Sequence, residues 1–491
     1  MNLYNEVNKA RIEFNSNTGM PLEEVILNEI DNWENSDRKE AMIKGQEYYA
    51  GKMAIDEKKR MVVGENGRLM EDKLVSNVKL KHNFIKKLVR QKVSYLLSEK
   101  IDVQTENDSY TKVLDEIFNN GFHKLLKNIM TESINKGIAW VYPYIENNKL
   151  KFQKLNSSEI IPLWKDNDHT RLDGAIRVYE QEYYEGDTLK TITRVEFYTE
   201  DRIKRWILKD NKLIPDIDMI EQFGESYINV EYADGESKGL SWGKVPLIYF
   251  KYNDLEQPLL LMIESLIDDY NMQRSLNSDM ILDTPNNIIH VRNYDGENPG
   301  EFRKNLSTYR IGFTSDDGDM KSMDVTINTE AYEKHIKTTR KDIFEFGGGV
   351  DTDFDSFGNS PSGIALEILY QDLDLDCNEI ETEFQSSLEY LMYFINLYIL
   401  EVLQAGDFEG EPFEFIFTRN KLNNESEIIK DLNESIKHGT LSKQTITERH
   451  PYAATDELER IEEESKSLDD EMDQYIHDLE SRTLDGGDID G

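Results

Sequence analysis

Three aspartates at alternate positions, Asp351, Asp353 and Asp355, have the spacing in this sequence that comes closest to a metal site. Carboxylates at positions 1, 3 and 5 open the calcium-binding loop of the EF-hand, where oxygen ligands surround a hard cation. That loop also requires glycine at position 6 and glutamate at position 12, and this chain has Ser356 and Ser362 there. The sequence therefore argues against calcium. A metal- or nucleotide-dependent enzyme built on the three aspartates is the alternative to the function predicted below.

Other catalytic patterns are also missing from the sequence. Gly347, Gly348 and Gly349 are not followed by the Gly-Lys-Ser/Thr of a phosphate-binding loop. The eight histidines show no pair at zinc-ligand spacing, and Ser360 lacks the glycine spacing of a hydrolase nucleophile. We predict no catalytic residue, no bound metal and no cofactor.

The composition predicts a soluble and strongly acidic protein. The 491 residues carry a formal net charge of −39, and 38% of them are hydrophobic, enough to build the cores of several domains. Tight static DNA binding is disfavoured because Lys and Arg make most phosphate contacts, yet an acidic wall suits a protein that lets DNA pass without holding it. A single cysteine, Cys377, excludes a disulfide within the chain and fits a reducing cytosol. Residues 1–14 lack the apolar core of a signal peptide and 390–400 are too short to span a bilayer, so no membrane association is expected.

The acidic loop lies between two predicted helices. Upstream, apolar residues at spacings of three and four predict a helix over 330–346, with one stripe formed by Tyr332, Ile336, Thr339, Ile343 and Phe346. Downstream, Ser362 can cap a second and much longer helix, which is expected to run over 363–405 to the stop signal at Gly406. The three glycines separate these helices because glycine disfavours helical conformation.

A further apolar stripe predicts a helix over 257–282, whose positions are Leu259, Ile263, Leu266 and Tyr270. Residues 283–329 then predict a small lobe of short strands joined by Gly and Asp turns. Because this lobe interrupts the chain between two helices, we expect it at their tips.

The first half of the chain is predicted to be α+β. Helices are expected over 22–33, 38–49, 78–97 and 114–135, and residues 61–67 are expected to be irregular. Alternating apolar and polar residues predict strands over 138–145, 150–155, 175–184, 191–198, 202–208 and 247–252. The helix over 78–97 has a basic face, which we interpret as paired with acidic neighbours in preference to a DNA-binding patch. Near the end, a strand over 413–417, helices over 428–437, 442–449 and 456–464, and a disordered acidic tail are expected.

Several short motifs, taken in their order and spacing, are similar to those of the bacteriophage portal proteins of the SPP1 type. The resemblance covers about residues 40 to 465, and the segments that carry it are Tyr48-Tyr49-Ala50-Gly51 with Ile55-Asp56, Asn83-Phe84-Ile85, Gly137-Ile138-Ala139-Trp140, Trp242-Gly243-Lys244-Val245-Pro246, Ser265 to Asn271 with Ser275, Ser362 to Leu366, and Gly439 to Thr445. Each segment is weak evidence alone, and their common order makes the resemblance specific.

The resemblance implies a portal fold that assembles as a ring, twelve subunits in the virion, around a DNA channel. Its parts would be a wing (1–256), a stem of two helices (257–282 and 330–346), a small α/β clip (283–329), a channel loop (347–362), a long kinked wing and crown helix (363–405), a helical crown (406–470) and the tail (471–491). Implied partners are double-stranded DNA in transit, the large subunit of the terminase, the major capsid and scaffolding proteins and a head-completion adaptor. The implied location is the portal vertex of the capsid, after assembly in the host bacterial cytoplasm.

Within this scheme the loop is the expected place of contact with DNA. Gly347, Gly348, Gly349 and Gly358 are expected to let it move relative to the stem, and Phe354 and Phe357 to supply apolar contacts. Asp351, Asp353 and Asp355, repeated around a ring, would form a negative collar that keeps the DNA backbone centred.

Overall fold

The structure, a computed structural model, describes residues 21–63, 67–73, 75–231, 237–283, 287–292, 298, 300, 317–324, 330–352, 363–419, 425–454, 456–461, 463, 464, 466 and 472. The chain forms two compact units, one of residues 1–351 with 372–420 and one of residues 352–371 with 421–491. The first unit contains nearly all of the described buried hydrophobic residues.

Most of the helices predicted from the sequence are confirmed by the structure. They are α2 (Leu22–Glu34), α3 (Asp37–Ala50), α4 (Phe84–Leu96), α5 (Asp108–Ile117), α6 (Asn120–Lys136), α7 (Ile217–Phe223), α8 (Leu260–Asp283), α10 (Glu330–Phe346), α11 (Gly363–Tyr398), α12 (Glu425–His438) and α13 (Lys443–Arg449). Short 3-10 turns are η1 (Ala54–Glu57) and η2 (Ser157–Glu159), and the π-helical turn η5 (Ile399–Leu403) extends α11.

The strands also follow the prediction, with additions. They are β1 (Met61–Val63), β2 (Leu69–Glu71), β3 (Asp102–Gln104), β4 (Ile138–Glu146), β5 (Lys149–Leu155), β6 (Ile160–Trp164), β7 (Leu172–Glu185), β8 (Thr188–Tyr198), β9 (Ile203–Lys209), β10 (Lys212–Pro215), β11 (Ile228–Glu231), β12 (Ser237–Leu240), β13 (Ile248–Lys251), β14 (Asn287–Arg292), β15 (Asp319–Asp324) and β16 (Glu414–Ile416). An antiparallel sheet has the order β10-β9-β8-β7-β6, and another has the order β13-β4-β5. The predicted α+β class is confirmed.

The helix predicted over 78–97 is wrong in its first third, because α4 begins only at Phe84. Residues 76–82, which we call the stem strap, run along α8 instead. The backbone N–H groups of Ser76, Val78, Leu80 and His82 donate to side chains of α8 at 3.0, 2.7, 2.9 and 2.8 Å, and the acceptors are Asp283, Asp279, Ser275 and Asn271. Four residues of an α-helix span ~6.0 Å along its axis, and two residues of an extended chain span ~6.6 Å. Because these lengths are similar, every second amide of the strap lies opposite every fourth residue of α8.

The centre of the strap is held by buried charges. Asp279 is fully buried and forms an ion pair with the buried Lys58, whose ammonium group also donates to the Val78 carbonyl at 3.0 Å. Arg60 lies 3.2 Å from Asp279 and 3.3 Å from Asp283. Polar side chains at positions 271, 275, 279 and 283 of α8 therefore replace the helical hydrogen bonds that residues 76–82 would otherwise make.

Two other predictions need correction. The helix expected over 114–135 is two helices, because Asn119 accepts from the N–H groups of Gly121 at 2.7 Å and Phe122 at 3.3 Å and so begins α6. The segment expected to be irregular over 61–67 opens with β1, which pairs with β2. Both strands are exposed along their length, so they lack the alternation of apolar and polar residues that predicts a strand.

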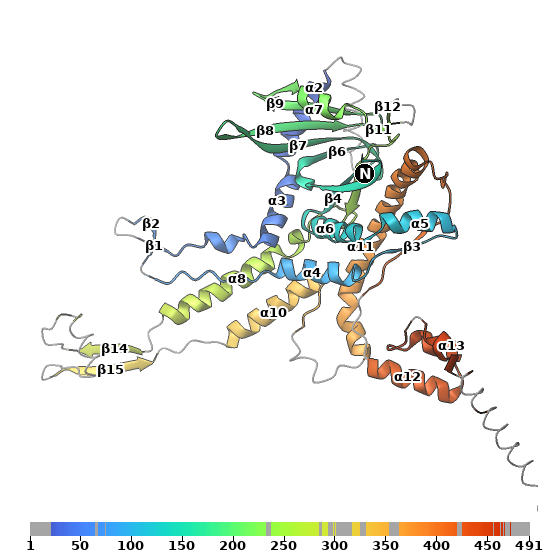
Figure 1. The fold of residues 1–491 in the computed structure, drawn as a ribbon. Coiled ribbons are helices and arrows are strands. Elements are labelled where there is room, and N and C mark those ends of the chain that lie inside the picture. Colours follow the sequence, from blue (N-terminus) through green and yellow to red (C-terminus); the bar gives the residue numbers. More distant parts are fainter. Residues whose placement is uncertain are drawn as a thin grey trace, which may run out of the picture. The chain divides into compact units, whose positions relative to one another are not determined.

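Helices α8 and α10 pack side by side (Figure 1). Leu259, Ile263, Tyr270, Ile336 and Ile343 are buried. Leu266 and Tyr332 are half-buried, and the buried residue at this point of α8 is Ile267 and not the predicted Leu266. Phe346 is 61% exposed, whereas Phe344 is buried, so the apolar stripe of α10 ends two residues earlier than predicted. The role of these residues in a stem stays a prediction.

The long helix α11 has the predicted place in the sequence. Its side chains Ile380, Phe384, Leu388, Leu391 and Ile395 are fully buried. The ring of Phe384 packs against Phe250 of β13, and Phe394 packs against Trp242. Cys377 is also buried, and burial raises the pKa of its thiol to about 12, which disfavours the reactive thiolate.

Strand β16 pairs with β3, which places residues 414–416 beside the N-terminal half of the chain. Arg419 lies 3.2 Å from Asp374 of α11 and forms a second ion pair with Glu381. In the other unit, α12 and α13 pack together, with Leu432 and Ile446 buried. The domain boundaries drawn from the resemblance stay predictions.

A buried carboxylate lies where the chain leaves β13 for α8. Glu256 forms an ion pair with Arg38, lies 2.7 Å from His169 Nδ1 and is 3.4 Å from Lys251 Nζ. Burial alone would raise the pKa of Glu256, but Arg38, His169 and Lys251 outweigh it and lower that pKa to about 2. Ion pairs therefore hold the segment between β13 and α8 against α3 and β13.

Replacing Glu256 by glutamine is therefore expected to destabilise the fold at neutral pH by about 3 kcal/mol, because Arg38 and Lys251 lose their counter-charge. A depressed carboxyl pKa stabilises the folded state above the ordinary value of 4.5, and this contribution is lost as the pH falls toward 2. The difference between wild type and E256Q in urea unfolding, measured from pH 7 to pH 3, should shrink below about pH 4.5. A difference that does not vary with pH would contradict this account.

Candidate functional site

The candidate site is the start of the acidic loop, residues 347–352, which we call the loop root. The structure describes Gly347, Gly348, Gly349 and Asp351. The other predicted loop residues lie outside the described part of the chain, and they are Asp353, Phe354, Asp355, Phe357 and Gly358. The predicted site is therefore visible only at its beginning.

The three glycines are tightly packed, which corrects the expectation that they let the loop move. A Cβ atom on Gly349 would lie 2.2 Å from Leu88 Cδ2, and one on Gly347 would lie 2.5 Å from the Ile343 carbonyl oxygen. Gly348 adopts a left-handed conformation with φ of 54°, which ends α10. Glycine is needed here because the backbone approaches α4 closely.

The next residue is held by a side chain of α4. Gln91 donates to the Val350 carbonyl at 2.7 Å through Nε2 and accepts from the Val350 N–H at 3.2 Å through Oε1. A single amide thus satisfies both backbone groups of Val350, as a neighbouring strand would. Val350 itself is buried.

The first aspartate of the loop is paired. Arg340 of α10 binds both carboxylate oxygens of Asp351 at 2.7 Å, in the two-pronged geometry that guanidinium and carboxylate groups favour. The pair with Arg340 offsets the negative charge of Asp351, and its expected share in a negative collar stays a prediction. The pair also occupies the carboxylate that the alternative metal site would need.

The lysines in and near α4 make two kinds of contact. Lys81 pairs with Asp56, and the fully buried Lys92 pairs with Asp376 at 2.7 Å, as the interpretation of paired charges predicts. Lys86 and Lys87 lie over aromatic rings instead, 5.8 Å from Tyr49 and 4.6 Å from Phe344. Most side chains of the basic face therefore contact other residues of the same chain.

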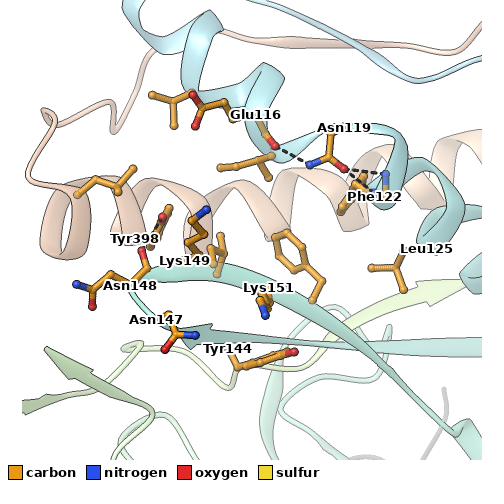
Figure 2. A pocket seen from close by; sticks show the side chains of 16 residues that line it. Glu116, Asn119, Phe122, Leu125, Tyr144, Asn147, Asn148, Lys149, Lys151 and Tyr398 are labelled. Carbon is orange, nitrogen blue, oxygen red and sulfur yellow. Dashed lines mark hydrogen bonds between the residues drawn. The ribbon is translucent and has the colours of Figure 1, made fainter.

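A separate cavity of about 660 Å³ lies between α5, α6, the β4–β5 hairpin and the end of α11 (Figure 2). Asn119 uses its carbonyl oxygen to cap α6 and donates to the Glu116 carbonyl at 2.7 Å, and Tyr398 donates to the Asn148 carbonyl at 3.1 Å. These polar groups hold the surrounding elements together. We assign this cavity no binding role.

Sequence reasoning missed Gln91, Lys92 and Arg340, which fix the loop root. One signal was present for Lys92. It lies four residues after Leu88 and eight after Phe84, on the apolar stripe of α4, where a lysine is buried and needs a partner. No comparable signal marked Gln91 or Arg340.

Comparison with known families decides what kind of protein carries this site. A family model described as "Phage portal protein, SPP1 Gp6-like" matches residues 29–471. The chain belongs to this family. The resemblance seen in the sequence motifs is thereby confirmed, and portal proteins are structural components of the virion.

Individual portal proteins align over nearly the whole chain. The portal protein of Bacillus phage SPP1 is 28% identical over 455 residues, covering 92% of this chain and 88% of the relative. The portal protein of Clostridium phage phiCD119 is 28% identical over 452 residues, covering 88% of this chain and 94% of the relative. Among solved structures, the neck of an empty gene transfer agent particle matches with a TM-score of 0.43 and 11% identity, over 74% of this chain and 88% of that one.

The structure explains why some motifs of this portal protein have their residue types. Asn271 and Ser275 are acceptors for the stem strap. Lys244 lies 3.9 Å from the ring centre of Tyr393 on α11. A Cβ atom on Gly137 would lie 2.0 Å from the Glu256 carbonyl oxygen. These motif residues therefore bind the stem strap to α8, place Lys244 against α11, and pack Gly137 against the segment that precedes α8.

Proposed function

We propose that this portal protein assembles into the ring at one vertex of the capsid, twelve subunits in the virion, and that double-stranded DNA passes through its channel during packaging and ejection. The observation that carries the proposal is the family match over residues 29–471. No catalysis is required for this role. Among the described residues, no helix could cross a membrane.

Ring assembly gives exposed apolar residues of the helix α8 a role. Leu261, Met262, Met280, Ile281 and Leu282 are each more than 40% exposed. In a closed ring every subunit contacts its two neighbours through the same two surfaces, so a neighbouring subunit would cover such residues. The proposed contact between stems therefore includes these exposed residues, which lie at the two ends of α8.

The proposed contact with DNA is the channel loop beyond its root. With Asp351 bound to Arg340, the negative charges left for the channel are Asp353 and Asp355. We propose that these two aspartates keep the phosphate backbone centred, while Phe354 and Phe357 give the loop its apolar contacts and Gly358 supplies its flexibility.

The proposed partners follow from the same function. The clip would dock the large subunit of the terminase and later a head-completion adaptor, and the wing and crown would contact the major capsid and scaffolding proteins. Assembly in the cytoplasm of the host bacterium belongs to this proposal.

The alternative of a metal- or nucleotide-dependent enzyme has lost support. Of its three aspartates, Asp353 and Asp355 lie outside the described residues, and Asp351 is bound by Arg340. The family contains structural components of virions. We keep the portal function alone.

Electron microscopy of the purified chain in negative stain tests the proposal directly. We expect closed rings without added ligand at micromolar concentration and moderate salt. Rings reconstituted with procapsids, terminase, ATP and linear DNA should then support DNA packaging. A monomer in light scattering, or rings that never support packaging, would overturn the proposed function.

Removal of residues 471–491 is expected to leave ring formation intact, because this acidic segment offers little apolar surface for burial. The measurement is the mass of the truncated protein by light scattering, beside that of the full chain. Loss of the ring on truncation would show that the segment takes part in assembly.

A further inference from the structure

Lys92 is the only lysine in the described part of α4 whose ammonium group is fully buried, and it contacts two separate elements. It donates to the Gly348 carbonyl oxygen in the loop root at 2.6 Å, and it lies 2.7 Å from Asp376 Oδ2 on α11. A buried ammonium group without partners is strongly disfavoured, so both contacts stabilise the folded chain.

Asp376 is held in turn by a second buried group. Tyr252, at the end of β13, donates to Asp376 Oδ1 at 2.9 Å, and burial together with Asp376 raises the pKa of this phenol well above its usual value. The phenol therefore stays protonated and a donor at neutral pH. The carboxylate of Asp376 cannot turn away from Lys92 without losing Tyr252.

Gly348 lies against both members of the ion pair. A Cβ atom at this position would lie 2.9 Å from Lys92 Nζ and 3.0 Å from Asp376 Cβ. The loop root, α4 and α11 therefore meet at one point. A shift of α11 against α4 at this level would break the ion pair or carry the loop root with it.

We propose that Lys92 is a positioning residue for DNA passage, because its ammonium group ties the root of the channel loop to α11. This inference rests on the proposed function. It implies that the position of α11 sets where the loop starts.

The variants that test this role separate positioning from stability. K92M alone leaves Asp376 without its cation and should destabilise the fold. K92M combined with Asp376→Leu removes both charges and should restore part of the stability, since a buried pair can often be replaced by apolar residues of similar size, although the Tyr252 hydroxyl then lacks its acceptor. Lys86→Met is the matched control, because Lys86 is on the same helix and none of its described contacts reaches the loop root.

The first readout is amide hydrogen exchange of residues 347–351 in assembled rings without DNA. In the wild type, the Gly349 N–H donates to the Phe344 carbonyl at 2.9 Å and the Val350 N–H donates to Gln91, so both should exchange slowly. The double variant should exchange about tenfold faster or more at these amides, while Lys86→Met exchanges like wild type. Packaging by rings of the double variant should be several-fold slower.

The proposal is overturned if the double variant shows the same amide exchange and the same packaging rate as the wild type, since the pair would then serve stability alone. If the double variant does not form rings, the single variant Asp376→Asn is measured in its place, because it keeps the shape of the side chain and removes its charge. We then expect faster exchange at the same amides, and unchanged exchange would contradict the proposal. If wild-type rings do not package DNA, the proposed function fails, while the exchange measurement still decides whether Lys92 fixes the loop root.

Discussion

Replacement of Asp279 by alanine is expected to lower the free energy of unfolding by about 3–5 kcal/mol, the largest stability effect predicted for a single residue of this chain. The carboxylate is fully buried and holds three groups at once, the Lys58 ammonium group, Arg60 at 3.2 Å and the Val78 N–H at 2.7 Å. Its removal leaves Lys58 buried without a counter-charge. The stem strap also loses the acceptor at its centre.

The measurement is urea unfolding of D279A against wild type, with two comparison variants. Lys58→Met with Asp279→Leu removes the charge imbalance and should recover much of the loss, although the Val78 N–H still lacks its acceptor. Asp269→Ala is the matched control on the same helix, because its partner His335 is 50% exposed and exposed pairs contribute little. A loss in D279A no larger than in D269A would contradict the assigned role.

Replacement of Asp353 and Asp355 by lysine is expected to slow DNA packaging several-fold and to make it more sensitive to salt. Each lysine that neutralises a phosphate strengthens binding in a salt-dependent way, so a ring of lysines would hold DNA that the aspartates repel. Asp351 is left unchanged, because its substitution would break the pair with Arg340 and disturb the loop root.

The control for this prediction replaces the same two residues by asparagine, which removes the charge without reversing it. Rings should assemble in both variants, because the substitutions lie beyond the loop root. Packaging rates at low and moderate salt are then compared for wild type and the two variants. A normal rate with a normal salt dependence in the lysine variant would show that the loop does not act through its charge.

Local patterns in the sequence were sufficient for the elements that bury one regular face. The stripes of α10 and α11, the alternation in β4, β5, β7 and β8, and the glycines that separate two helices all depend on neighbouring residues. The ordered motifs likewise placed the chain among portal proteins, because they keep residue types that bind one another across the fold. The predicted place of the loop between two helices was right for this reason.

Contacts between distant residues decided the rest. Residues 78–82 have a helical pattern, yet Val78 and His82 bind side chains 201 and 189 positions away, and those bonds outweigh local propensity. Similarly, Gln91 reaches Val350 across 259 positions, and Lys92 reaches Gly348 across 256. The glycine-rich loop root is packed and charge-paired only because the folded chain brings α4 and α11 beside it, and spacing along the sequence carries no information about such neighbours.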